Sequence, residues 1–122
     1  MEYAVKDALR NKRLFEAESQ LLHEQLEDGR IRSHADAGER VRIVDAKLKR
    51  IGIWLLLLTE DERYVIQRHY LDGIDIPRIV LEYKERWGDE FAKTERTIKT
   101  YQRKAIIKIC TFELQNQAYV FV

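Results

Sequence analysis

Apolar residues recur three and four positions apart along most of the chain, which is the spacing of amphipathic helices. Residues 2–27 contain neither glycine nor proline and predict one long helix that ends at Asp28 and Gly29. Its main apolar stripe consists of Ala8, Phe15, Leu22 and Leu26, and a second short stripe consists of Leu14 and Leu21. Residues 30–38 are polar and predict a loop or a frayed connection, with Ser33 and Asp36 as candidate starts of the next helix.

A second helix follows, with an apolar stripe at alternating spacings of three and four. This heptad stripe consists of Val41, Val44, Leu48, Ile51 and Leu55. It can pack against the first helix or against a second copy of the protein, which makes a homodimer through these residues one of two alternatives. The outer surface of the same helix is basic and predicts a solvated face, although it could also contact phosphate; its residues are Arg40, Arg42, Lys47, Lys49 and Arg50.

Local capping signals predict three further helices. Thr59 and Glu62 form a capping box at the start of the third helix, and Asp72 with Gly73 gives its stop. Asp75 is placed to cap a fourth helix that has Pro77 in its first turn, and Thr94 is placed to cap a fifth.

The apolar positions of these three helices predict their buried sides. The predicted core residues are Val65, Ile66 and Tyr70 in the third helix, Ile76, Ile79, Val80, Tyr83 and Trp87 in the fourth, and Ile98, Tyr101, Ala105, Ile106 and Ile109 in the fifth. Trp54 is likewise predicted to be a packing anchor, and Phe91 is predicted to point inward from the connection 89–93. Residues 111–122 have weak periodicity and predict a tail that docks, pairs with a partner or frays.

The length and composition favour an all-α fold, in a single compact domain or in a small domain with a helical appendage. The 122 residues include one proline and five glycines, too few for the many turns of an all-β fold. The single Cys110 cannot form an internal disulfide, and there is no signal peptide or membrane-spanning apolar run, so we expect a cytoplasmic protein. The most apolar segment, residues 51–58, is too short to cross a bilayer and predicts core.

Positive charge is concentrated in the fifth helix. Residues 93–108 contain six basic residues against the single acid Glu95, a local net charge of +5, whereas the whole chain has a net charge of only +1. The helical register places Arg96, Lys99 and Arg103 on the face opposite the apolar residues. A basic face of this kind binds nucleic acid in some proteins and only aids solubility in others.

Residues 58–109 resemble region four of bacterial sigma factors and the sigma-like helix-turn-helix proteins of bacteriophages. The matching residues are Glu62, Arg63, Val65, Ile66 and Tyr70 in the first helix, Gly73, Asp75 and Ile79 in the turn and supporting helix, and Thr94, Thr97, Ile98, Lys104 and Ala105 in the recognition helix. With a helical region in front of this module, the chain further resembles small phage regulators of late or packaging genes, the ArpU-like group.

The chain also departs from this family. Arg78 stands where the family usually has an acid, and Val80 where it usually has alanine. About eight residues are added between Ile79 and Thr94, which predicts two extra turns on the supporting helix as far as Trp87, followed by a longer turn.

The resemblance implies binding of double-stranded promoter or operator DNA, with the helix 94–109 in the major groove. Its base-facing residues would be Glu95, Arg96, Lys99 and Thr100. Its phosphate contacts would be Lys93, Arg103 and Lys104, joined by Arg63, Arg68 and Arg78 from the preceding helices.

We therefore predict an N-terminal helical pair at 1–57, a helix-turn-helix at 58–110 and a tail at 111–122, acting as a transcriptional regulator. The rival hypothesis is a protein-interaction module, binding RNA polymerase or another partner, that keeps the helix-turn-helix shape. Catalysis, a metal or a cofactor is not expected, because His23, His34, His69 and Cys110 show no metal-ligand spacing and no phosphate loop or nucleophile motif is present.

Overall fold

The computed structural model describes residues 1–29 and 34–116, together with the side chains of all of these except residues 34–37. Over these ranges the chain forms only helices and the turns between them, which confirms the all-α prediction. The six α-helices are α1 (Glu2–Arg10), α2 (Lys12–Glu27), α3 (His34–Leu56), α4 (Glu60–Ile66), α5 (Ile76–Trp87) and α6 (Glu95–Asn116). A π-helical turn, η1 (Gln67–Leu71), extends α4, and a 3-10 turn, η2 (Asp89–Phe91), follows α5.

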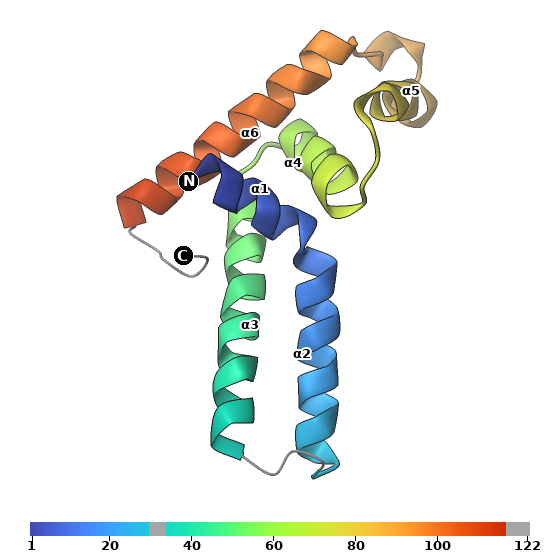
Figure 1. Ribbon diagram of the computed structural model, residues 1–122. Coiled ribbons are helices and arrows are strands. Elements are labelled where there is room, and N and C mark those ends of the chain that lie inside the picture. The colour runs from blue at the N-terminus through green and yellow to red at the C-terminus, as the bar shows by residue number, and fades with distance from the viewer. Residues whose placement is uncertain (30–33, 117–122) are drawn as a thin grey trace.

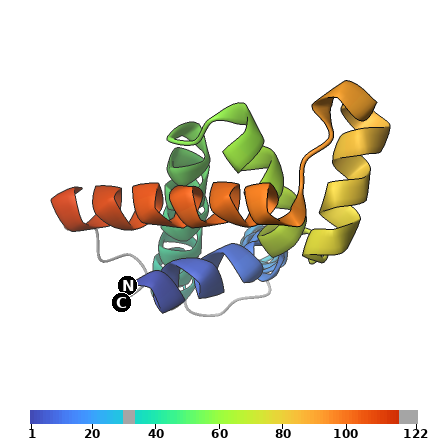
Figure 2. The same ribbon diagram turned by 90° about the horizontal axis from the view of Figure 1, so that it is seen from above.

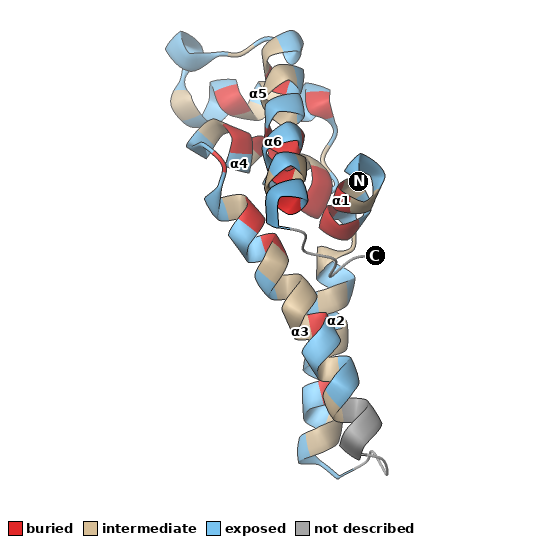
Figure 3. Cartoon of the chain, turned by 90° about the vertical axis from the view of Figure 1, so that its left-hand side faces the viewer, coloured by how far each residue is buried: buried red, intermediate tan, exposed pale blue. Residues whose placement is uncertain are grey.

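The helices form a body from which a two-helix arm projects (Figure 1). Helices α2 and α3 run antiparallel as the arm, whereas α1, α4, α5 and α6 form the body. Helix α6 lies along one side of the body, with α1 beside it and α5 near its N-terminal end (Figure 2). The buried residues concentrate in the body, and most of the arm is intermediate or exposed (Figure 3).

The predicted single helix over residues 2–27 is wrong, because the chain bends at Asn11 into α1 and α2. Asn11 has φ −93° and ψ 5°, outside the regular helical values. The bend lets Val5 and Leu9 of α1 pack in the body while α2 turns away to pair with α3. The cause is therefore tertiary packing, which overrides the local helical preference of an uninterrupted sequence.

Two clusters of buried side chains form the core. The first joins α1, α3, α4, η1 and α6 and contains Val5, Ala8, Leu9, Ile51, Trp54, Leu58, Ile66, Tyr70, Leu71, Ala105, Ile106 and Ile109. The second joins α4, α5 and α6 and contains Val65, Ile76, Ile79, Tyr83 and Ile98. Helix α6 contributes to both clusters, so its orientation is fixed along most of its length.

Most of the predicted core positions are confirmed, with exceptions at Phe91 and in the segment 51–58. In that segment Ile51, Trp54 and Leu58 are buried, but Ile53, Leu56 and Leu57 are exposed on the other side of the chain, so the prediction that the whole segment is core is wrong. All of the predicted core residues of α4, η1, α5 and α6 are buried or half-buried, and Trp54 is buried as well. Phe91 was predicted to point inward, but it is exposed. It lies in η2, which follows Gly88 and carries no buried residue.

The heptad stripe of α3 is used within the chain. Val44 and Ile51 are buried, and Val41, Leu48 and Leu55 are half-buried. The Ser19 hydroxyl of α2 donates to Asp45 Oδ1 of α3 at 2.6 Å, which adds a polar contact to the pairing. Ile51 and Leu55 pack in the body core, so a homodimer through the same stripe would require contacts within the chain to break.

The predicted caps form, and two helix ends differ from the prediction. Thr59 and Glu62 make the capping box, the Asp75 carboxylate accepts from the Arg78 amide, and Thr94 Oγ1 accepts from the Thr97 amide. Helix α4 passes into η1 before Gly73, which has φ 71°. Helix α6 continues to Asn116, so residues 111–116 belong to a helix instead of a tail, and residues 117–122 lie outside the described residues. No helix in the described part of the chain is long and apolar enough to cross a membrane.

Candidate nucleic-acid interface

The N-terminal half of α6 presents a polar, mostly basic face to solvent. Thr94 fixes the start of the helix by accepting the Thr97 amide at 3.2 Å. Burial of Ile98 in the second core cluster and of Ala105 in the first then sets the rotation of the helix about its axis. The opposite face carries Arg96, Lys99, Thr100, Arg103 and Lys104, all exposed except Thr100, which is half-buried. We call these five residues the outward face of α6.

The four residues predicted to face bases have different local partners. Lys99 Nζ lies 2.9 Å from Glu95 Oε1, so these two exposed side chains form an ion pair along the helix. The Thr100 hydroxyl donates to the Arg96 carbonyl oxygen at 2.9 Å and is therefore satisfied by its own helix. The Arg96 guanidinium has no hydrogen bond or ion pair with any side chain that the structure describes. It is the member of this set that is most available to a ligand.

The six residues predicted to contact phosphate fall into two groups. Lys93, Arg103 and Lys104 lie at or on the outward face, and none makes an ion pair with another described residue. The remaining three arginines lie on α4, η1 and α5 and are engaged in the fold.

The engaged arginines have identifiable structural partners. Arg63 donates from Nε to the Leu55 carbonyl at 3.0 Å and so satisfies the C-terminal end of α3. Arg68 donates to both carboxylate oxygens of Glu82, at 2.6 and 3.0 Å. Arg78 pairs more loosely with Glu82 and with Glu85, at 3.9 and 3.5 Å. A phosphate at these three positions would have to compete with the partners already present.

The contact between α4 and α5 is held by aromatic rings and by Glu82. Tyr64, Tyr83 and Trp87 pack with ring centroids 4.5 to 5.3 Å apart. The Arg68 guanidinium, helped by the Tyr64 hydroxyl, holds the pKa of the Glu82 carboxyl below its ordinary value. The Tyr83 hydroxyl donates to Asp61 Oδ1 at 2.9 Å, and burial raises the pKa of that phenol. As predicted, α5 extends to Trp87, which supplies one of these rings.

Two buried carboxylates anchor α6, and the sequence pattern did not identify either role. Glu62 of α4 accepts from Lys108 Nζ at 2.6 Å, in addition to its place in the capping box. Burial would raise the pKa of the Glu62 carboxyl, but the hydrogen bonds from Lys108 and Thr59 outweigh it and leave the pKa below the ordinary value. Because Lys108 is paired with Glu62, it is not one of the unpaired cations of α6.

Glu113 anchors the C-terminal half of α6 to α3. Only 4% of Glu113 is exposed, and its carboxylate accepts from Arg50 Nε at 2.7 Å and from the Trp54 indole nitrogen. The Arg50 guanidinium also lies over the Phe112 ring, 4.9 Å from its centroid. Arg50 was predicted to belong to a solvated face, so this part of the prediction is wrong. The only available signal was a lone acid one turn beyond Ile109, which is too common to be diagnostic.

Side chains able to support other chemistry lie apart. His23 contacts Asp45 at 3.1 Å, and His69 Nδ1 lies 2.9 Å from the Ile74 carbonyl oxygen, whereas the side chain of His34 lies outside the described residues. Burial raises the pKa of the Cys110 thiol. The described residues contain no group of three or more His, Cys, Asp or Glu placed to hold a metal ion.

The chain matches no protein-family model, no curated protein and no solved structure.

Proposed function

We propose that this chain binds double-stranded DNA through the outward face of α6 and acts as a transcriptional regulator of the phage or mobile-element type. The observation that carries the proposal is the set of exposed cations Arg96, Arg103 and Lys104, which have no acidic partner among the described residues. A cation without a partner can neutralise a phosphate or contact a base without first breaking an ion pair.

The arrangement of the last three α-helices supports the same proposal. In a helix-turn-helix, one helix rests on a supporting helix and places its first turns against base edges in the major groove. Here α6 packs on α4 and α5, while its N-terminal turns keep their polar side chains in solvent. Arg96 is in the first turns and could donate to both guanine acceptors, and Lys99 and Thr100 lie beside it.

The remaining positive residues would position the helix on the backbone. Lys93 precedes the N-terminus of α6, and Arg103 and Lys104 lie two turns along it. If these three residues each neutralise one phosphate, the logarithm of the binding constant should fall with the logarithm of salt concentration with a slope of about −2.7. The resemblance to sigma region four adds to this proposal through Thr94, Thr97 and Lys104.

A salt-dependent binding assay tests the proposal. Fluorescence anisotropy with labelled duplexes that carry candidate promoter sequences should show binding by the intact chain, and a titration at several salt concentrations gives the slope. Lys104→Ala should make the slope less negative by about 0.9, whereas Arg96→Ala should cost about 1–3 kcal/mol and reduce discrimination between sequences.

Arg40→Ala is a matched control because it removes the same charge from α3, where Arg40 pairs with Glu18 at 3.6 Å. Affinity and slope should be unchanged in this variant. If Arg96→Ala and Lys104→Ala behave like Arg40→Ala, α6 does not contact DNA and the proposal is wrong.

The second candidate function is binding to a protein partner, with RNA polymerase as the first to test. The observation in its favour is that the outward side of α6 becomes apolar toward its C-terminal end, at Ile107 and Leu114. Native electrophoresis of the chain with RNA polymerase, in the absence of DNA, distinguishes the two functions. If the chain shifts the mobility of RNA polymerase, and if Arg96→Ala keeps this shift whereas Ile107→Asp abolishes it, the protein partner is favoured.

A further inference from the structure

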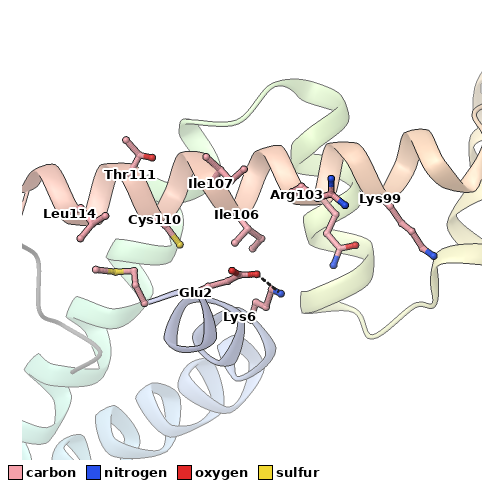
Figure 4. Close-up of a pocket in the computed structure, with 11 residues that line it drawn as sticks. Glu2, Lys6, Lys99, Arg103, Ile106, Ile107, Cys110, Thr111 and Leu114 are labelled. Atoms are coloured by element: carbon pink, nitrogen blue, oxygen red, sulfur yellow. Dashed lines mark ion pairs between the residues drawn. The ribbon is translucent and has the colours of Figure 1, made fainter.

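A groove runs between α1 and α6, on the side of α6 that carries Lys99 and Arg103. Its volume is about 710 Å³, and Figure 4 shows side chains from both helices facing into it. Along α6, Lys99 and Arg103 line one end of the groove and Leu114 lines the other, with Ile107 between them (Figure 4). The distance along α6 from Lys99 to Leu114 is about 22 Å at the rise of an α-helix. The groove is therefore as long as four helical turns, with one basic end and one apolar end.

One solvent-facing side of α6 carries residues at the spacing of a coiled coil. Thr100, Arg103, Ile107, Cys110 and Leu114 are separated by three, four, three and four residues, which places them on one side of the helix. This stripe is separate from the core stripe, since Ile107 is 56% exposed and Leu114 is 64% exposed. Two large apolar side chains one heptad apart are thus uncovered in the single chain.

Helix α2 carries a second uncovered stripe with the same spacing. It consists of Leu14, Ala17, Leu21, Glu24 and Asp28. Leu14 is 66% exposed and Leu21 is 52% exposed, because α2 uses its opposite side, with Leu22 buried, to pack against α3. Along α2 the stripe extends for about 21 Å, with an apolar start and an acidic end. The stripe is therefore about as long as the groove. Each has one apolar end and one charged end, which is acidic on α2 and basic in the groove.

We propose that the groove of one molecule binds α2 of a second copy of this chain, antiparallel to α6. In this register Leu14 lies against Leu114 and Leu21 against Ile107. Both pairs are separated by seven residues, so the two contacts can form at once. Glu24, the next residue of the α2 stripe after Leu21, then lies opposite Arg103.

Charge selects the antiparallel direction. A parallel arrangement with the same leucine and isoleucine contacts would place Glu24 beyond Leu114, so that no acid of the α2 stripe would face Lys99 and Arg103. The antiparallel arrangement instead places the acidic end of α2 at the basic end of the groove. The two copies are therefore complementary in both apolar contacts and charge.

The interface joins two different surfaces, so it differs from a homodimer through the heptad stripe of α3. Each copy has one groove and one exposed α2 stripe, and two copies can exchange these contacts reciprocally or continue into a larger assembly. The arm that carries α2 projects from the body, which leaves its outer side accessible to a neighbour (Figure 1). Lys99 and Arg103 also belong to the outward face of α6, but the association of two copies does not require DNA.

Light scattering and sedimentation equilibrium over a concentration series test the association, using the intact chain without DNA at low salt. The wild-type chain should associate. Leu21→Asp alters only the stripe, and Ile107→Asp alters only the groove. Each variant should weaken self-association at least about tenfold, because each places a carboxylate in an apolar contact. Far-UV circular dichroism checks that both exposed-site variants remain folded.

Mixing the two variants gives the decisive measurement. Leu21→Asp keeps an intact groove and Ile107→Asp keeps an intact stripe, so the mixture should form a mixed complex although neither variant associates alone. A contact between two identical surfaces would not be restored in this way. Leu81→Asp, an exposed site on α5, is the control and should associate like the wild type.

Charge reversal tests the register. Glu24→Lys or Arg103→Glu alone should weaken association, and the two changes in one chain should restore it. A wild-type chain that stays monomeric at every soluble concentration would overturn the proposal, as would a mixture that stays monomeric. Association that appears only when the chain is shortened to end at Asn116 would assign the groove to residues 117–122 and would also overturn it.

Discussion

Replacing Glu113 by alanine should destabilise the fold more than any surface change of the same size. The carboxylate is buried and accepts from the Arg50 guanidinium at 2.7 Å and from the Trp54 indole nitrogen. Removing one partner of a buried pair typically costs about 3–5 kcal/mol, because the other charge loses its compensation. The Arg50 side chain keeps 17% of its surface in solvent, so we expect the lower end, about 3 kcal/mol. For 122 residues this lowers the melting temperature by roughly 12 °C.

Urea unfolding followed by far-UV circular dichroism measures this cost near neutral pH. Glu113→Gln keeps an acceptor oxygen but removes the charge and should cost about 1–2 kcal/mol. Glu90→Ala provides the control, because Glu90 is an exposed acid of η2 and its removal should cost about 0.5 kcal/mol or less. A loss below about 1 kcal/mol for Glu113→Ala would show that the Glu113–Arg50 pair stabilises the fold no more than an exposed ion pair does, and it would contradict the prediction.

Two further predictions concern acid stability and backbone conformation. The folded pKa of Glu62 lies below its unfolded value of 4.5, so its stabilisation is complete above that pH and is lost as the pH falls through the folded pKa. Glu62→Gln should therefore flatten the fall in urea midpoint on acidification, and an unchanged profile would contradict this. Gly73→Ala should cost about 1 kcal/mol because Gly73 has φ 71°, whereas Gly52→Ala, inside α3 with open space around it, should gain about 0.5–1 kcal/mol. Equal effects of the two glycine changes on the urea midpoint would show that backbone conformation does not determine them.

The features that could be predicted from sequence are those set by neighbouring residues. Thr59, Asp75 and Thr94 cap their helices because a side chain and an amide three positions on are enough to form each bond. The rotation of α6 was predictable for the same reason, since the spacing of Ile98 and Ala105 defines its buried side.

The features that could not be predicted depend on residues far apart in the chain. Glu113 gains its role only because the fold brings it within hydrogen-bonding distance of Arg50 on α3. Arg50 lies 63 residues earlier in the sequence. The bend at Asn11 likewise depends on where α1 packs. The candidate interface lies between these cases: the sequence located the exposed cations, but only the structure showed that Arg63 and Arg68 are engaged elsewhere.

The packing of α1 against α6 has a consequence for how this chain folds during synthesis. Val5 and Leu9 belong to the same core cluster as Ile106 and Ile109, about 100 residues later. At typical elongation rates, the first helix is made roughly 5–20 s before its partner exists. Through this interval α1 lacks the part of its cover that Ile106 and Ile109 supply, while α2 and α3 can already pair. A ribosome stalled before α6 emerges should therefore display a folded arm beside an unfinished body, with Val5 and Leu9 open to chaperones.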